Sequence, residues 1–315
     1  MTDIKNTSYS KGFGIFSKVS EEKLAVGQDN TLRLFMLNTE NKLFNYDELY
    51  AYILPNVTRY VFSRKRLADI ENDPIKQQTI ILEALSHLRP VENDKDKGAG
   101  GELGEILLYL FLEQDLKAPK LFSKVELKTN AQDYVKGSDG IHFKFRKNAL
   151  GESIMQLIIG EAKIKNDLKD GIDDAFKSIN TFLTSNIQDN NLLDTHLMDQ
   201  MVDENEAKEI KEYITAIPRK KKETVFGIFI GYSVDYDGAT DSNDEYDQKI
   251  ISENIQQVLN MRQEIINQIS KYSVSNYEFN FYFLPFHNAM RDRKTIIKQL
   301  TRGKPRFSWE DIRNG

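Results

Sequence analysis

The sequence predicts an α/β protein, and three observations lead to this prediction. Its 315 residues are 40% hydrophobic and 29% charged, which is the composition of a globular chain with a sizeable core. An apolar helical pattern over residues 102–113 is followed by three strand-like runs. A second helical pattern and a further strand-like run come next, so helices and strands alternate as they do when helices cover a sheet.

Residues 1–95 are predicted to form an N-terminal α+β accessory domain. Apolar residues alternate over residues 31–37 (TLRLFML), a pattern typical of a small sheet. Helices are expected over residues 47–70 and 75–88, separated at Asp73-Pro74 because proline suits the first turn of a helix. The polar, glycine-rich stretch 89–101 then predicts a boundary with a second domain, residues 96–315.

The second domain opens with a helix that we expect to be buried nearly all round. Its apolar residues recur at helical spacing, and further leucines fill the opposite side. The run 154–164 is almost continuously apolar, as a central strand would be. The other strands are expected at 120–129, 139–146, 224–232 and 277–284, and the other helices at 167–183 and 248–271.

Composition excludes several functional classes. The chain has 43 basic and 48 acidic residues, so any contact with nucleic acid needs a local basic patch and a metal ion. The absence of cysteine excludes thiol nucleophiles, disulfides and cysteine-based zinc sites. No phosphate-binding loop for ATP, no membrane span and no signal peptide is recognisable, so we expect a cytoplasmic protein without a nucleotide cofactor.

Acidic residues fall at unusual places in this skeleton. Side chains alternate between the two faces of a strand, which puts Asp139 on the same face as Phe143. The first residue of an otherwise apolar face is therefore a carboxylate. Glu161 and Lys163 project together from the end of the apolar run 154–164, on the side of Leu157. Both strands are therefore predicted to present charged groups where apolar ones would be expected.

Two further acids lie on the helix over residues 102–113. At 100° per residue, Glu105 falls between Leu112 and Tyr109, whereas Glu102 lies on a more polar side. Glu105 is thus the better candidate for a semi-buried acid.

Converging carboxylates point to a divalent cation. Burying carboxylates without partners costs several kcal/mol, and a cation relieves their mutual repulsion. Mg²⁺ (or Mn²⁺) prefers oxygen ligands and keeps waters, one of which can attack a phosphodiester. Lys163 could then orient this water and stabilise charge on the phosphate. A Glu-X-Lys pair alone is usually a surface ion pair, so the prediction rests on the combination of helix acid, strand acid and pair.

In these residues the chain resembles the PD-(D/E)XK nuclease superfamily. The segments 101–105 (GELGE), 137–142 (GSDGIH) and 160–163 (GEAK) more narrowly resemble the HamA family, effector nucleases of Hachiman anti-phage defence systems. The resemblance is strong over residues 98–183. One departure is Ser138, which stands where the superfamily name has proline.

The resemblance implies a fold, residue roles and a partner. It implies a restriction-endonuclease-like αβββαβ core in which Asp139 and Glu161 are metal ligands and Lys163 is the catalytic lysine. Glu105 would be the helix acid and a third ligand, with Glu102 as the alternative. The partner would be a HamB-like superfamily 2 helicase that restrains the nuclease until damaged or foreign DNA is met.

The function expected is Mg²⁺-dependent hydrolysis of DNA with low sequence specificity, because no DNA-reading motif is recognisable. Two alternatives stay open: a catalytically inactive subunit that binds DNA or the helicase, and an RNA-cutting toxin with the same site. The accessory domain is expected to dock the helicase.

Basic clusters are the candidate phosphate contacts. They are residues 64–66, 219–222 and 291–294, supplemented by Lys165 and Lys169. His142 alternates to the face opposite Asp139, which favours packing over substrate contact.

Overall fold

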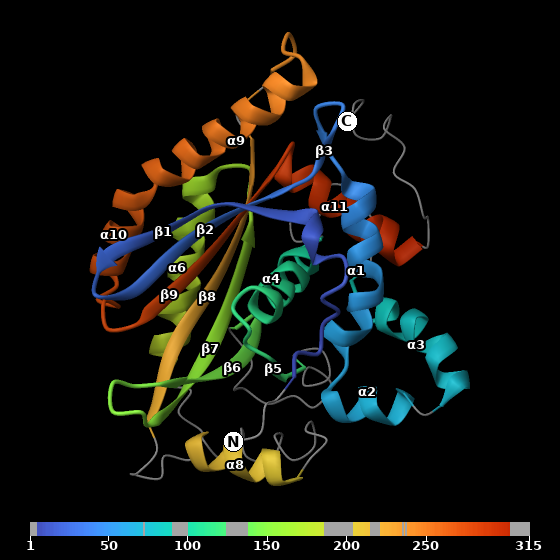
Figure 1. Cartoon of the computed structure of the whole chain (residues 1–315), viewed down its shortest axis with the longest axis vertical. Coiled ribbons are helices and arrows are strands. Elements are labelled where there is room, and N and C mark those ends of the chain that lie inside the picture. The colour runs from blue at the N-terminus through green and yellow to red at the C-terminus, as the bar shows by residue number, and fades with distance from the viewer. Residues whose placement is uncertain are drawn as a thin grey trace.

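A seven-stranded mixed sheet forms the centre of the computed structural model, which describes residues 5–71, 73–89, 100–123, 138–185, 204–214, 221–234, 236 and 238–302 (Figure 1). Within those ranges the strand order is β1-β2-β9-β8-β7-β6-β5. The inner strands β2, β9, β8 and β7 are parallel, whereas β1, β6 and β5 pair antiparallel. The strands are β1 (Phe16–Val26), β2 (Gln28–Leu37), β5 (Lys120–Phe122), β6 (Gly140–Lys147), β7 (Ser153–Ile164), β8 (Lys221–Ser233) and β9 (Glu278–Phe286), with a separate short pair β3 (Thr39–Glu40) and β4 (Leu43–Phe44).

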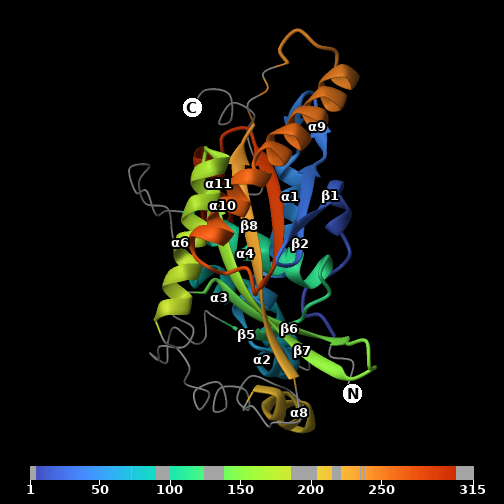
Figure 2. The same ribbon diagram turned by 90° about the vertical axis from the view of Figure 1, so that its left-hand side faces the viewer.

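Helices lie on both sides of the sheet, which confirms the predicted α/β class (Figures 1 and 2). They are η1 (Phe13–Ile15), α1 (Tyr46–Val61), α2 (Arg64–Glu71), α3 (Pro74–Ser86), α4 (Glu102–Gln114), α6 (Leu168–Thr184), α8 (Glu204–Ile214), α9 (Asn243–Asn260), α10 (Arg262–Lys271) and α11 (Ala289–Arg302). Helix α4 packs on one face with α1 and α11, and helices α6 and α10 pack on the other.

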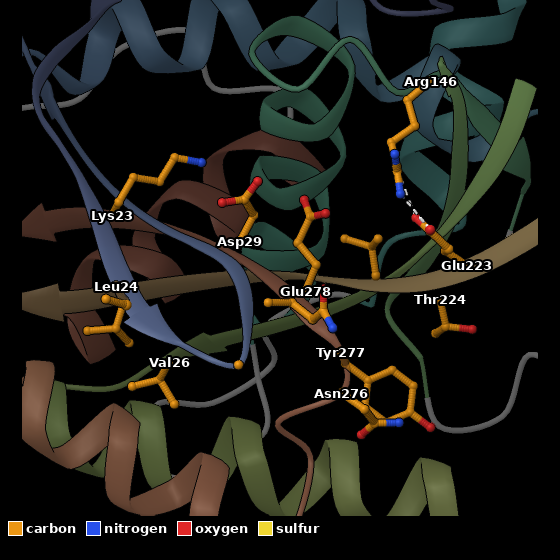
Figure 3. Close-up of a pocket in the computed structure, with 14 residues that line it drawn as sticks. Lys23, Leu24, Val26, Asp29, Arg146, Glu223, Thr224, Asn276, Tyr277 and Glu278 are labelled. Carbon is orange, nitrogen blue, oxygen red and sulfur yellow. Dashed lines mark hydrogen bonds and ion pairs between the residues drawn. The ribbon is translucent and has the colours of Figure 1, made fainter. Parts of the chain in front are cut away.

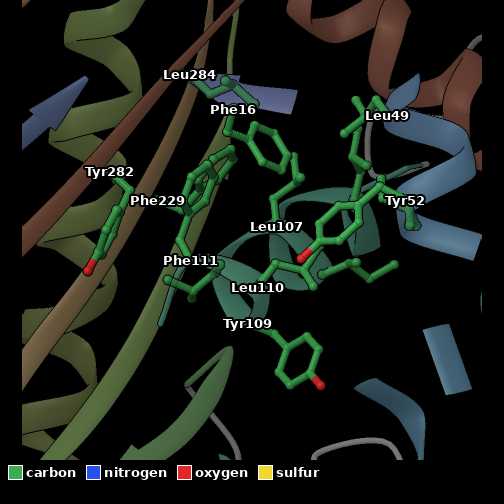
Figure 4. Close-up of a cluster of buried hydrophobic side chains, with 14 of the residues drawn as sticks. Phe16, Leu49, Tyr52, Leu107, Tyr109, Leu110, Phe111, Phe229, Tyr282 and Leu284 are labelled. Atoms are coloured by element: carbon green, nitrogen blue, oxygen red, sulfur yellow. The ribbon is translucent and has the colours of Figure 1, made fainter. Parts of the chain in front are cut away.

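Helix α4 is buried nearly all round, as its sequence predicts. Phe111 stacks between Phe229 of β8 and Tyr282 of β9, with ring centroids 5.9 and 5.4 Å away (Figure 4). A side chain at Gly160 or Gly227 would collide with leucines of α4, so these two glycines let the helix approach the sheet closely. This close packing fixes the start of α4, with its two acids, beside the end of β7.

The expectation of a small separate sheet near the N-terminus is wrong. Strand β2 pairs in parallel with β9, from Thr31 opposite Asn280 to Leu34 opposite Phe283. Leu34 packs into the hydrophobic cluster of one sheet face, whereas Phe35 packs into that of the other. A strand that is apolar on both faces belongs inside a large sheet. The division into domains near residue 95 stays a prediction, and the sheet contains strands from both sides of it.

Two predicted helices are each interrupted. The expected helix 47–70 is broken into α1 and α2 because Phe62 is extended, with φ −97° and ψ 149°, and is fully buried. The expected helix 248–271 is divided at Met261 into α9 and α10.

Helix α11 was not predicted. The boundary at Asp73-Pro74 is confirmed, since Asp73 caps α3 and proline occupies its first turn. Of the strand expected at 120–129, residues 124–129 lie outside the described residues.

Candidate active site

Three of the predicted site residues meet at the end of β7. Gly140 of β6 is the antiparallel partner of Gly160 of β7. Asp139, the residue just before β6, therefore lies beside the last residues of β7. The Asp139 backbone N–H donates to the Gly160 carbonyl at 2.8 Å. The Asp139 carboxylate accepts from the Ala162 N–H, also at 2.8 Å. These two bonds fix Asp139 next to Glu161.

Glu161 is a buried carboxylate on the sheet face that α6 covers, and the residue is 5% exposed. Burial and the neighbouring Asp139 raise the pKa of the Glu161 carboxyl to about 7. The ion pair with Lys163 and a hydrogen bond with Ser178 of α6 act in the opposite direction. Ionising Glu161 therefore costs free energy that a nearby cation would recover.

The acids of α4 lie around a tyrosine hydroxyl. Tyr60, in the last turn of α1, donates to a Glu105 carboxylate oxygen at 2.7 Å. Burial, followed by the negative charges of Glu105, Asp139 and Glu102, raises the pKa of Tyr60 far above its ordinary value. Its hydroxyl therefore stays protonated and serves as a donor.

One Glu102 oxygen is buried and has no hydrogen-bond partner among the residues that the structure describes. Such an atom costs free energy unless a ligand or water satisfies it. The charges of Glu105, Glu102 and Asp139 all act on the Tyr60 hydroxyl, and Glu105 and Glu102 remain alternative candidates for the helix position.

The donor set suits a hard divalent cation. In the part of the chain that the structure describes, no three histidine or acidic side chains already form a closed metal-binding group. Mg²⁺, however, is commonly held by one or two carboxylates together with waters and substrate phosphate. Asp139 and Glu161 fit that requirement, because both are carboxylates and the repulsion between them raises the pKa of Glu161.

Tyr60 and Ser178 were missed by sequence reasoning. Tyr60 comes from the segment expected to be an accessory domain, where no motif distinguishes it from the other tyrosines of α1. Ser178 lies in α6, the helix that follows the Glu-X-Lys pair. The sequence does not indicate which side chain a serine within a helix will contact.

Histidine and basic candidates have mainly structural contacts. The packing role of His142 is confirmed: it is 1% exposed, and its ring bonds the Ala118 carbonyl at 2.8 Å. Arg64 donates to the backbone carbonyls of Lys5 and Lys120. Ion pairs also join Arg66 to Glu83, Lys165 to Asp174, Lys169 to Asp173 and Glu264, and Arg291 to Asp292. Of the cluster 219–222, residues 219 and 220 lie outside the described residues.

A groove of about 920 Å³ lies at the opposite end of the strands (Figure 3). The turn between β1 and β2 and the first residues of β8 and β9 form it. Glu223 in its wall pairs with Gln156, whereas Glu161 lies five residues further along β7. The groove is therefore separate from the acidic site.

Comparison with known proteins gives one family. The family model HamA matches residues 14–300, nearly the whole chain. Neither the curated proteins nor the solved structures contain a significant match. No helix in the described ranges is long and apolar enough to cross a membrane.

Proposed function

Because the chain belongs to the HamA family and is a component of a Hachiman defence system, we propose that it is a metal-dependent DNA nuclease. The reaction would be hydrolysis of DNA phosphodiester bonds with low sequence specificity. One observation carries the proposal: the buried carboxylate of Glu161 lies beside the half-buried carboxylate of Asp139, next to Lys163, at the end of an interior strand.

The order of elements supports a PD-(D/E)XK core. Helix α4 precedes β5, β6 and β7, and helices α6 and α8 follow before β8, which lies in the same sheet as β5, β6 and β7. Apart from α8, the described elements follow the αβββαβ order, and the positions of the acids on the helix, before the second strand and at the end of the third agree with the superfamily pattern.

The roles follow from the positions of the side chains. Asp139 and Glu161 would hold Mg²⁺ or Mn²⁺, with Glu105 as a third acid. When bound, the cation supplies positive charge that favours ionisation of water and offsets the charge of the phosphate. Lys163 is held at the site by its contact with Glu161, and its ammonium group would orient the attacking water and stabilise charge that develops on the phosphate.

Plasmid digestion with Mg²⁺, Ca²⁺ or EDTA tests this proposal. We expect cutting by the wild-type protein with Mg²⁺, and a loss of about 100-fold or more in Lys163→Ala. Lys249→Ala is the matched control, because Lys249 of α9 pairs with Asp241, which is not a site residue. The assay is run with and without the helicase partner, since an inhibited complex would otherwise resemble an inactive enzyme.

The substrates and variants separate the alternatives. Cleavage of RNA in preference to DNA would indicate the RNA-cutting toxin. Phage protection retained by folded Asp139→Asn and Glu161→Gln proteins would indicate an inactive binding subunit.

We propose that a helicase partner controls the nuclease and docks on helix α3. Only Ala84 of this helix is buried, whereas Ile75 and Leu82 are 77% and 68% exposed. A groove of about 370 Å³ lies between α2 and α3, and the apolar side chains of Ile70 and Ile80 line it. Exposed apolar side chains next to a groove are typical of protein interaction sites.

Charged substitutions on α3 test the docking surface. Ile75→Asp together with Leu82→Asp should abolish co-purification of the helicase. Leu150→Asp is the control, because Leu150 is 81% exposed in the turn between β6 and β7. A complex that survives the double substitution would exclude α3 as the docking surface.

A further inference from the structure

We infer that Tyr60 is a positioning residue of the proposed active site, where its hydroxyl holds the Glu105 carboxylate in place for the cation. The inference rests on the proposed function and extends it to a residue of the N-terminal segment. Nothing in the motifs of the sequence assigns Tyr60 this role.

The contact between Tyr60 and Glu105 is short, and it joins a buried donor to a half-buried carboxylate. The hydroxyl donates at 2.7 Å, and Tyr60 is 5% exposed. Its ring lies 5.9 Å from that of Tyr109 on α4, so the phenol has a packed wall as well as a polar partner. A buried donor to a carboxylate is a strong hydrogen bond, since one partner is charged.

The chain around Tyr60 is fixed by a second set of contacts. The Lys120 ammonium group donates to the carbonyls of Tyr60 and Phe62, at 3.2 and 2.8 Å. Ser123 donates to the carbonyl of Val61. These groups satisfy the last carbonyls of α1, and the lysine charge opposes the helix dipole there. The end of α1 is therefore tied to β5, and Tyr60 is held toward the site.

The chemical consequence concerns the orientation of Glu105. Because the hydroxyl occupies one carboxylate oxygen, the rotation of the carboxyl group is restricted and the other oxygen is directed consistently. Partners of this kind in metal sites typically change metal affinity or activity by about 10- to 100-fold when they are removed. A protein lacking residues 1–95 would lose this donor.

Mn²⁺ binding to Tyr60→Phe, measured by calorimetry without DNA, tests the inference. We expect binding about 10-fold weaker than in the wild type. DNA cleavage should need a correspondingly higher Mg²⁺ concentration, while the KM for DNA is unchanged. Tyr109→Phe is the matched control: Tyr109 is equally buried and adjacent, but its hydroxyl bonds Thr7, so its Mn²⁺ affinity should be that of the wild type.

A double-mutant cycle with Glu105→Gln separates positioning from a structural role. Tyr60→Phe should have little further effect on Mn²⁺ binding once Glu105 is replaced. If Tyr60→Phe binds Mn²⁺ as tightly as the wild type, the inference is overturned and the proposed function still stands. Loss of the fold in Tyr60→Phe has the same consequence. A wild-type protein that neither binds Mn²⁺ nor cuts DNA overturns the proposed function together with it.

Discussion

The two ends of strands β6 to β8 carry charged residues under opposite conditions. At one end, Arg146 and Glu223 form an exposed pair of opposite charge in the wall of the groove (Figure 3). At the other end, Asp139 and Glu161 bring like charges together where Glu161 is buried. Solvent and pairing satisfy the first set, whereas the second retains an electrostatic cost. The repulsion between Asp139 and Glu161 therefore identifies the candidate active site, and the volume of the groove at the other end does not.

Removal of the like charges should have the largest effect. Asp139→Asn and Glu161→Gln should each reduce the single-turnover rate of DNA cleavage by about 1000-fold or more, because each removes a proposed ligand of the cation. Glu223→Gln, at the other end of the strands, should leave the rate unchanged. Cleavage at the wild-type rate in Asp139→Asn would end the comparison between the two ends.

His142, a buried residue outside the site, tests whether burial shifts a pKa as it does at Glu161. The quantity measured is the free energy of unfolding. Burial lowers the pKa of His142 to about 4. The unfolded chain takes up this proton below pH about 6.5, whereas the folded protein does so only below about 4, so the free energy of unfolding falls as the pH falls between these values. The loss should reach up to about 3 kcal/mol.

Urea unfolding from pH 7 to pH 4 measures this loss. His142→Asn should show a weaker pH dependence, since an amide does not take up a proton. An identical dependence in the variant would mean that other groups cause it, with His287 the next candidate because burial also lowers its pKa to about 4.

Mg²⁺ or Ca²⁺ should stabilise the folded protein by relieving the repulsion at the acidic end. At a cation concentration 100 times its Kd, the free energy of unfolding should rise by about 2.7 kcal/mol. Thermal unfolding with and without the cation measures the rise, which should be absent in Glu161→Gln. A similar rise in that variant would place the cation elsewhere.

The smallest effect is expected at the paired end. Arg146→Ala should change the free energy of unfolding by no more than about 1 kcal/mol, because exposed ion pairs contribute little. DNA cleavage should stay at the wild-type rate. A marked loss of DNA binding in Arg146→Ala would instead make the groove part of the nucleic-acid contact.

What the sequence could predict depended on how local each interaction is. The end of β7 was predictable, since alternation within one strand places Glu161 and Lys163 on the same side. The Tyr60–Glu105 contact was not, because it joins two helices through a tertiary arrangement that no local pattern encodes. The break at Phe62 had the same origin: burial of its ring in the core outweighed a continuous helical pattern.

The parallel pairing of β2 with β9 has a consequence for biosynthesis. Residue 31 cannot pair with its neighbour, residue 280, until the chain up to that residue has left the ribosome. The hairpin of β1 and β2 therefore keeps one unpaired edge until β9 has been synthesised. Until that strand is made, β2, β9, β8 and β7 cannot join into one sheet, so the scaffold that carries the candidate active site stays incomplete until residue 286 has been synthesised.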